Sequence, residues 1–237
     1  MCDLENCDPN DLSRPSVSPT DRRLFLAGAL ALPLATILAN VDLAEAQAAK
    51  GVSINQTTAD GRTVSAYFAE ADKKDTPVVI LIHEWWGLND NIKTMAEDIR
   101  AKGFHAIAID LFNGSVATNR DEAKTQTKAV KASEANATIA AWVDWAKANG
   151  NGKVATLGWC FGGGWSLSAA LNTKLDAAVI YYGRVTANAD SLQKLNAPLL
   201  GHFGTLDKSI NPEMVGAFQK NLAQAGKSDL MTTHWYT

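Results

Sequence analysis

One cysteine lies at the centre of a Gly-x-Cys-x-Gly pattern, in the stretch GWCFGGGW of residues 158–165. The stretch follows VATLG (residues 154–158), which is typical of a strand, and it precedes a segment that we expect to be helical. A side chain on such a strand-to-helix turn is lifted out of the sheet, and the helix N-terminus behind it favours a thiolate. We therefore interpret Cys160 as a nucleophile; the alternative is an inert, buried small side chain.

Other chemistries of glycine-rich or histidine-bearing stretches do not fit this sequence. It has no G-x-x-x-x-G-K phosphate loop, no G-x-G-x-x-G dinucleotide motif and no C-x-x-C redox pair. HEWWG, which begins at His83, is not the H-E-x-x-H zinc motif, because its fifth residue is Gly87. We expect no metal site and no cofactor.

The elements that must position Cys160 follow an alternating pattern from Gly51 onward. Short β-rich runs alternate with longer helical ones, which favours an α/β fold with a mostly parallel central sheet covered by helices on both faces. The first two runs flank the turn Asp60-Gly61 and predict an antiparallel hairpin. The predicted strands are residues 52–56, 63–68, 77–83, 104–110, 154–158, 177–182, 197–203 and a last one from about 230, and the predicted helices are residues 89–102, 120–149, 165–171 and 211–225.

The chain of 237 residues divides into an export signal and one folded domain. In residues 1–49, Arg22-Arg23 precede an apolar run that is shorter than a membrane span, and small residues follow it. These features are typical of a twin-arginine (Tat) signal and predict a periplasmic or secreted protein. An uncleaved anchor or a disordered tail is the alternative. Residues 50–237 then form the domain.

The charge balance of residues 50–237 excludes some partners. Residues 1–49 hold three of the 22 basic and seven of the 25 acidic residues, which leaves 19 against 18. A nearly neutral domain gives no reason to expect a nucleic acid or an anionic membrane as partner. We expect a monomer whose partners are the Tat machinery and a small-molecule substrate. Cys2 and Cys7 would leave with the signal, so Cys160 would be the only cysteine of the mature protein.

Five motifs together resemble the dienelactone hydrolase (carboxymethylenebutenolidase-like) family of α/β-hydrolases. They are IHEWWGLN at 82–89, AIDLF at 108–112, GWCFGG at 158–163, YYG at 181–183 and LGHFGTLD at 200–207. The resemblance extends over residues 51–237 and implies an enzyme that hydrolyses lactones or small activated esters through a cysteine acyl-enzyme, without a cofactor. The family's dienelactone-binding members hold the substrate carboxylate with arginines; here the matching position is Gly114, and neither Arg120 nor Arg184 fits the motif. Dienelactone itself is therefore not the expected substrate.

The resemblance also implies roles for single residues. Cys160 is the nucleophile, Asp207 is the acid of the triad, and Glu84 is a carboxylate that contacts the thiol and governs its ionisation. The backbone N–H groups of Phe161 and Trp85 form the oxyanion hole. The alternatives are that Asp207 is an ordinary turn residue and that Glu84 satisfies the backbone of its loop.

The histidine of the triad has no matching position in the sequence. In this fold the histidine follows the acid, and only His234 follows Asp207. His234 lies in HWYT, which resembles the family's last strand, and the family's histidine comes several residues later. We therefore expect a C-terminally truncated chain in which the last strand and helix are incomplete and His234 is a poor substitute. His83, His105 and His202 are expected to be structural.

Two other functions remain open. The chain could be a catalytically impaired fragment or pseudoenzyme that at most binds a small ligand in the same cleft. A thiol redox role of Cys160 would instead require fast sulfenic acid formation.

Overall fold

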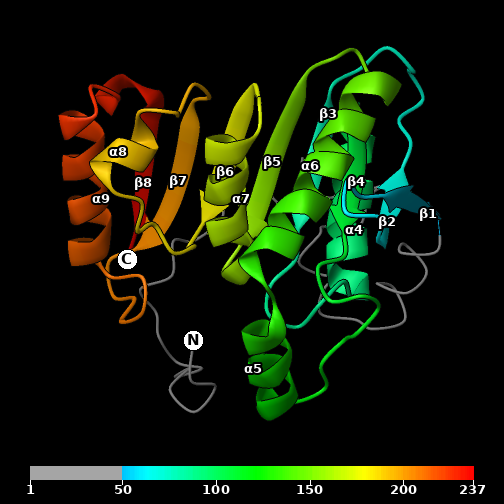
Figure 1. The fold of residues 1–237 in the computed structure, drawn as a ribbon, viewed down its shortest axis with the longest axis horizontal. Coiled ribbons are helices and arrows are strands. Elements are labelled where there is room, and N and C mark those ends of the chain that lie inside the picture. The colour runs from blue at the N-terminus through cyan, green and yellow to red at the C-terminus, as the bar shows by residue number, and fades with distance from the viewer. Residues whose placement is uncertain (1–49) are drawn as a thin grey trace, which may run out of the picture.

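Eight strands form one sheet in a computed structural model, which describes residues 50–237 (Figure 1). The predicted export signal, residues 1–49, lies outside the described residues. The strand order is β1-β2-β4-β3-β5-β6-β7-β8. The strands are β1 Val52–Thr57, β2 Thr63–Ala69, β3 Val78–Ile82, β4 His105–Ile109, β5 Val154–Trp159, β6 Ala177–Tyr181, β7 Leu199–Gly204 and β8 Met231–Tyr236.

The strand directions confirm a mostly parallel sheet. β1 pairs with β2, and β2 with β4, in antiparallel register, whereas every pair from β4 to β8 is parallel. The predicted opening hairpin is therefore present, and its turn is closed by Gly61, whose φ is 83°. Because β3 to β8 are parallel, their carboxyl ends lie at one edge, and the loops after them can meet there.

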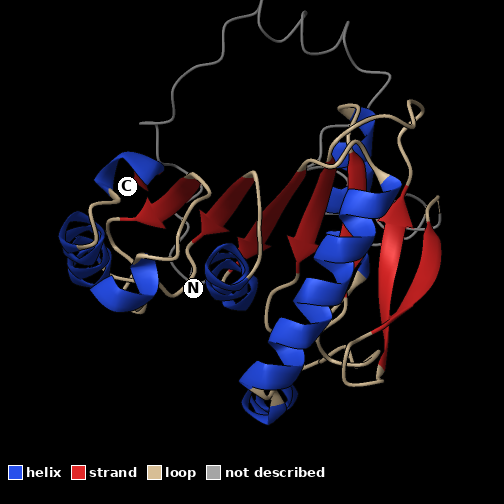
Figure 2. Cartoon of the chain, turned by 45° about the horizontal axis from the view of Figure 1, so that its top comes forward, coloured by secondary structure: helices blue, strands red, loops and turns tan. Residues whose placement is uncertain are grey.

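Helices cover the two faces of the sheet unequally (Figure 2). α6, α7 and α9 pack on one face, where they bury the apolar side chains of alternate strand residues such as Ile80 and Ile180. α4 lies on the opposite face, against Leu81 and Ala108. The helices are α4 Asp90–Ala101, α5 Arg120–Ala129, α6 Ala132–Asn149, α7 Phe161–Asn172, α8 Ala189–Leu192 and α9 Pro212–Gln224, with a 3-10 turn at Ser228–Leu230. No helix in residues 50–237 is long and apolar enough to cross a membrane.

The prediction of a single helix over residues 120–149 is wrong in one respect. The segment forms two helices, α5 and α6, with a break at Val130. Val130 adopts an extended backbone, with ψ at 119°. No glycine or proline marks the break in the sequence. The two helices differ in how many side chains they bury. α5 buries only Ala123, whereas α6 packs a stripe of side chains that includes Ile139 and Trp142 against the sheet. The break lets α5 turn away from the sheet toward the loop after β3.

The helix predicted to begin at Trp165 begins earlier, at Phe161. Glycine is a poor helix former, so the sequence indicated a turn at residues 162–164. In the structure these glycines form the first turn of α7 instead, because the helix starts in close contact with β3 and the loop after β6. Tertiary packing has overridden local propensity.

The face of the sheet opposite α7 carries a row of stacked rings on β5 to β8. The Trp159 and Tyr181 rings lie 6.1 Å apart, Tyr181 and His202 4.3 Å, and His202 and His234 5.3 Å between ring centroids. Interplanar angles of 19°, 7° and 16° make the row nearly parallel. All four rings retain solvent exposure. Trp159, at one end of the row, also packs against the apolar cluster that includes Ile92 and Ala96 of α4.

Candidate active site

The turn between β5 and α7 holds Cys160 in an unusual backbone conformation. Its φ is 54° and its ψ is −115°. The Cys160 N–H donates to the Tyr181 carbonyl at 3.0 Å, and the Cys160 carbonyl accepts from Gly163 at 3.1 Å. The residue thus sits between the end of β5 and the first turn of α7, with an exposed side chain. This is the strand-to-helix elbow that the sequence pattern predicts.

The glycines around Cys160 allow close packing rather than turn formation. A Cβ at Gly158 would lie 2.1 Å from the Gly162 carbonyl oxygen, and a Cβ at Gly162 would lie 2.1 Å from that of Ile82. A Cβ at Gly163 would meet the Cα of Gly183 at 2.7 Å. The N-terminus of α7 is therefore pressed against the ends of β3 and β6, which brings the loops after those strands next to the thiol.

The Cys160 thiol faces two carboxylates. Partial burial raises the pKa of Cys160 above its ordinary value, and the negative charges of Glu84 and then Asp207 raise it further. The Phe161 N–H, which points at the sulfur, opposes them by stabilising the thiolate. The structure thus brings together Cys160, Glu84, Asp207 and the Phe161 amide, and at rest the thiol form is favoured.

Tyr182 holds Glu84, a contact that the sequence did not predict. Its hydroxyl donates to Glu84 Oε1 at 2.9 Å, across 98 residues of sequence. Burial, followed by the charge of Glu84, raises the pKa of Tyr182, so the hydroxyl remains a donor. The φ of Tyr182 is 38°, which is uncommon for a residue other than glycine. One signal in the sequence indicated this contact: Tyr182, which has a hydroxyl at the end of a long side chain, lies directly after β6 and before Gly183 in YYG.

Asp207 lies on the loop after β7 and is bonded within that loop. Its Oδ1 accepts from the backbone of Ser209 at 2.7 Å and of Ile210 at 2.9 Å. These bonds fix the side chain, whereas the neighbouring Leu206 is 82% exposed. Asp207 is therefore both a loop-capping residue and a charge close enough to Cys160 to affect the pKa of the thiol.

The loop after β3, which carries Trp85, is held at its backbone by α5 and by the loop that precedes α5. Gln126 of α5 donates from Nε2 to the Trp85 carbonyl at 2.7 Å. The Ala117 N–H donates to the Trp86 carbonyl at 2.9 Å. Gly87, with φ at 98°, lies so close to the Ser115 carbonyl that a Cβ would meet it at 2.3 Å. No motif indicated the contact to Gln126, because it depends on the helix break at Val130.

The four histidines divide into a buried pair and a pair with solvent exposure. His83 and His105 are buried, and each bonds backbone groups through both ring nitrogens. His202 bonds the Tyr236 hydroxyl at 2.8 Å, and His234 stacks on His202. Within residues 50–237, no histidine forms a hydrogen bond to Asp207 or Cys160.

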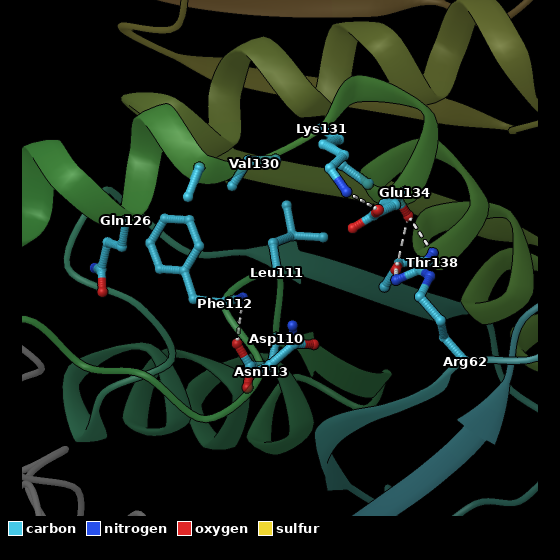
Figure 3. Close-up of a pocket in the computed structure, with 12 residues that line it drawn as sticks. Arg62, Asp110, Leu111, Phe112, Asn113, Gln126, Val130, Lys131, Glu134 and Thr138 are labelled. Carbon is cyan, nitrogen blue, oxygen red and sulfur yellow. Dashed lines mark hydrogen bonds and ion pairs between the residues drawn. The ribbon is translucent and has the colours of Figure 1, made fainter.

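A separate cavity of about 150 Å³ lies beside the end of β4 (Figure 3). It is lined by Phe112 and Gln126, among others, and Arg62 closes one side of it. Arg62 is already engaged, donating to the Glu134 carbonyl at 2.8 Å and to Thr138 Oγ1 at 3.4 Å. Cys160 does not line this cavity. The described residues also contain no cluster of three or more side chains suited to a metal ion.

Comparisons with known proteins bear on the family and the fold of the chain. A model described as "Dienelactone hydrolase family" matches residues 64–236. A "Putative carboxymethylenebutenolidase" of Escherichia coli is 31% identical over 185 residues, which cover 70% of this chain and 68% of that protein. Carboxymethylenebutenolidase 1 of Cupriavidus pinatubonensis is 24% identical over 198 residues, covering 78% and 82%. Among solved structures, a dienelactone hydrolase-like promiscuous phosphotriesterase from metagenomic libraries superposes with a TM-score of 0.68 at 22% identity, covering 79% of this chain and 82% of that one.

Proposed function

The chain belongs to the dienelactone hydrolase family, and from that premise we propose that it hydrolyses lactones or small activated esters through an acyl-enzyme at Cys160. The observation that carries the proposal is the elbow itself. An exposed thiol lies at the start of α7, beside one amide N–H and two carboxylates. This is the combination that covalent acyl transfer requires: a nucleophile, an electrostatic control of its ionisation, and a donor for the developing oxyanion.

The first chemical step is attack of Cys160 Sγ on the carbonyl carbon of the ester or lactone. The thiol proton passes to the Glu84 carboxylate, which Tyr182 holds by its hydroxyl. The carbonyl oxygen becomes an oxyanion, which the N–H groups of Phe161 and Trp85 stabilise. When the tetrahedral intermediate collapses, the C–O bond breaks and the alkoxide leaves, taking up the proton. A thioester at Cys160 remains.

The second step is hydrolysis of this thioester by water. Water adds to the thioester carbonyl, the C–S bond breaks, and the acid product and the Cys160 thiol are released. In a complete triad a histidine held by Asp207 would activate the water. His202 and His234 instead stack on one another. Deacylation is therefore the step that we expect to limit turnover.

That stacking favours a second candidate function. A chain that forms the thioester but does not hydrolyse it would act as a single-turnover or ligand-binding protein. Loss of a triad histidine typically costs several orders of magnitude in rate. The two candidates thus share the acylation step and differ only in the fate of the thioester.

The substrate class is inferred from the places of three arginines in the domain. Arg62 is bound to α6. Arg120 begins α5, and Arg184 follows Gly183 beside the first turn of α7. None of the three forms an arginine pair at the elbow of the kind that dienelactone-binding relatives use. We therefore propose uncharged lactones and small activated esters rather than a dicarboxylate.

We also propose that residues 1–49 direct the protein through the Tat pathway to the periplasm and that the mature domain acts as a monomer. Replacing Arg22 and Arg23 together by lysine should keep the protein in the cytoplasm, as fractionation would show. Unchanged export of this double variant would contradict the proposed signal.

The catalytic proposal is tested by mixing the full chain with excess p-nitrophenyl acetate and recording nitrophenol release together with the intact mass. We expect a burst of one equivalent and an acetyl group on Cys160, neither of which occurs in Cys160→Ala. A burst followed by steady release supports the hydrolase. A burst without further release supports the second candidate. Equal release by the wild type and Cys160→Ala would overturn both.

A further inference from the structure

The peptide group that joins Glu84 to Trp85 carries one of the two proposed oxyanion donors. No described peptide bond is cis, so the Glu84 carbonyl and the Trp85 N–H point in opposite directions across one rigid plane. Within residues 50–237 the Trp85 N–H donates to no protein acceptor. Whatever holds the Glu84 carbonyl therefore sets the direction of a donor that is free to meet a ligand.

Two groups hold that carbonyl: the Gly87 N–H donates to it at 3.3 Å, and the side chain of His83 makes the shorter contact. The His83 side chain is completely buried, and its Nδ1 lies 2.6 Å from the Glu84 carbonyl oxygen. Its Nε2 lies 3.1 Å from the backbone N–H of Leu111 and accepts that hydrogen bond. An amide N–H can only donate, so Nε2 must be unprotonated and Nδ1 must carry the ring proton. The tautomer of His83 is thus fixed by the chain that leaves β4, and it makes His83 a donor to the Glu84 carbonyl.

The surroundings of the ring keep it in this neutral form. Burial lowers the pKa of His83. Among the described residues, the carboxylate that faces the ring from another element is that of Asp110, whose Oδ1 is 4.0 Å from Nε2. Both Asp110 oxygens are already engaged, with the N–H groups of Phe112 and Gly114. Glu84 contributes its backbone carbonyl, while its carboxylate bonds Tyr182.

We propose that His83 is a positioning residue of the oxyanion hole: by donating to the Glu84 carbonyl it aims the Trp85 N–H at the substrate and strengthens that N–H as a donor. The inference rests on the proposed function and deepens it. A hydrogen bond into a carbonyl polarises the peptide and makes its N–H more acidic, because bonds in a chain reinforce one another. This role differs from that of a simple core contact, because it depends on one hydrogen bond to the peptide that carries the Trp85 N–H.

A second contact links His83 to the other oxyanion donor. The Phe161 ring lies 6.0 Å from the His83 ring, at an interplanar angle of 16°. Phe112 packs against both, at centroid distances of 4.6 Å and 5.2 Å. His83 therefore contacts both the Glu84 carbonyl, in the peptide that carries the Trp85 N–H, and the side chain of Phe161. The buried His83 ring thus fixes the position of the loop after β3 relative to the first turn of α7.

Two substitutions of His83 separate its two hydrogen bonds. In His83→Asn the side-chain amide takes the place of Nδ1 and can still donate to the Glu84 carbonyl. In His83→Gln the side-chain carbonyl takes the place of Nε2 and can still accept from Leu111. Each variant keeps one bond and loses the other, so a general loss of packing should affect both alike.

The measurement compares two reactions of the same thiol. Acetylation of Cys160 by p-nitrophenyl acetate develops an oxyanion, whereas alkylation by iodoacetamide does not. We expect His83→Gln to lose at least about tenfold in the acetylation rate, a fraction of what a missing oxyanion donor costs, with alkylation nearly unchanged. His83→Asn should lose clearly less. Equal losses in the two variants, or a parallel loss in the two reactions, would overturn the proposal.

A measurement on the unmodified protein covers the case in which the variants fail to fold or the wild type is not acetylated. Wild-type acetylation no faster than that of Cys160→Ala would remove the proposed function. The ¹⁵N shifts of the His83 ring decide the positioning inference separately. We expect a protonated Nδ1 and an unprotonated Nε2. A protonated Nε2 would show that His83 does not donate to the Glu84 carbonyl and would overturn the inference.

Discussion

The candidate site lies along the edge formed by the carboxyl ends of the parallel strands, and the two ends of this edge differ in how tightly they are packed. At the β3–β4–β5 end, the proposed oxyanion loop rests on the buried side chains of His83 and Asp110. At the β7–β8 end, Leu206, Trp235 and Tyr236 are all exposed. The contacts that hold the first end join distant parts of the chain, such as Gln126 and Trp85, 41 residues apart. Those of Asp207 reach only two and three residues along the same loop.

This difference separates the two halves of the proposed reaction. Attack on a carbonyl uses the nucleophile and the oxyanion donors, which the packed end supplies with little freedom to move. Activation of water uses the acid and a base, which belong to the exposed end. Preorganised donors contribute most to catalysis because they do not need to reorient during the reaction. The structure is thus better prepared for acylation than for deacylation.

The largest expected effect tests the close packing at the first end. In Gly162→Ala the new Cβ would lie 2.1 Å from the Ile82 carbonyl oxygen and 2.6 Å from that of His83. Backbone atoms cannot move aside as a flexible side chain can, so we expect a loss of at least about 3 kcal/mol in the free energy of unfolding. Urea denaturation measures it.

Gly216 is the matched control for Gly162→Ala. It lies within α9, where an added Cβ meets no atom within 4 Å. Gly216→Ala should therefore stabilise the protein, by about 0.5–1 kcal/mol. A cost below about 1 kcal/mol for Gly162→Ala would show that α7 is not pressed against β3.

The next comparison sets His83 against His202 in acid. Burial lowers the pKa of both below the ordinary value of 6.5, and His202 is much the more exposed. The unfolded chain therefore takes up these protons first. The stability that depends on neutral histidine is fully present above pH 6.5 and is lost as the pH falls through the folded pKa.

We expect His83→Asn to remove more of this pH dependence than His202→Asn does. The free energy of unfolding, measured by urea titration at several values between about pH 7.5 and 5, gives the comparison. If His202→Asn removed more of the pH dependence than His83→Asn, the exposed end, rather than the packed end, would limit stability in acid.

A smaller effect concerns the charges that control the thiol. The charge of Glu84 raises the pKa of Cys160 more than that of Asp207 does. Both Glu84→Gln and Asp207→Asn should shift the pH profile of Cys160 alkylation by iodoacetamide toward lower pH, and Glu84→Gln should shift it further. The reverse order would place control of the thiol at the β7 end.

The smallest effect is expected at the exposed end. Leu206 is 82% exposed, so Leu206→Ser removes almost no buried apolar area. The free energy of unfolding should change by less than about 0.5 kcal/mol. A larger loss in a thermal denaturation experiment would indicate that this loop packs against something in solution.

The sequence predicted the features that depend on local pattern. Buried strands such as residues 77–83 produce continuous apolar runs, and the elbow of Cys160 has a recognisable glycine spacing. The start of α7 was missed because three glycines disfavour a helix locally, while close contacts with Ile82 and Gly183 require two of them, Gly162 and Gly163. The break at Val130 was missed because it depends on contacts far apart in the sequence. It lets α6 pack on the sheet while Gln126 of α5 reaches the Trp85 carbonyl.

The positioning contacts of the site were the least accessible to sequence reasoning. Tyr182 meets Glu84 across 98 residues, and the roles of both depend on the exact ends of β3 and β6. His83 was expected to be structural, and its buried contacts fit that expectation. Its bond to the neighbouring carbonyl gives the same contacts a proposed part in the reaction. Only the three-dimensional structure reveals which carbonyl a buried ring meets.

The backbone conformation of Cys160 has a consequence for the stability of the fold. At φ 54° and ψ −115° a cysteine is strained, at a cost of about 1–3 kcal/mol. Glycine would occupy the same conformation without that cost. Selection for a stable fold alone would therefore favour glycine at this position, and Cys160→Gly should raise stability. The nucleophile that we propose therefore stands at a position where its own backbone conformation makes the fold less stable.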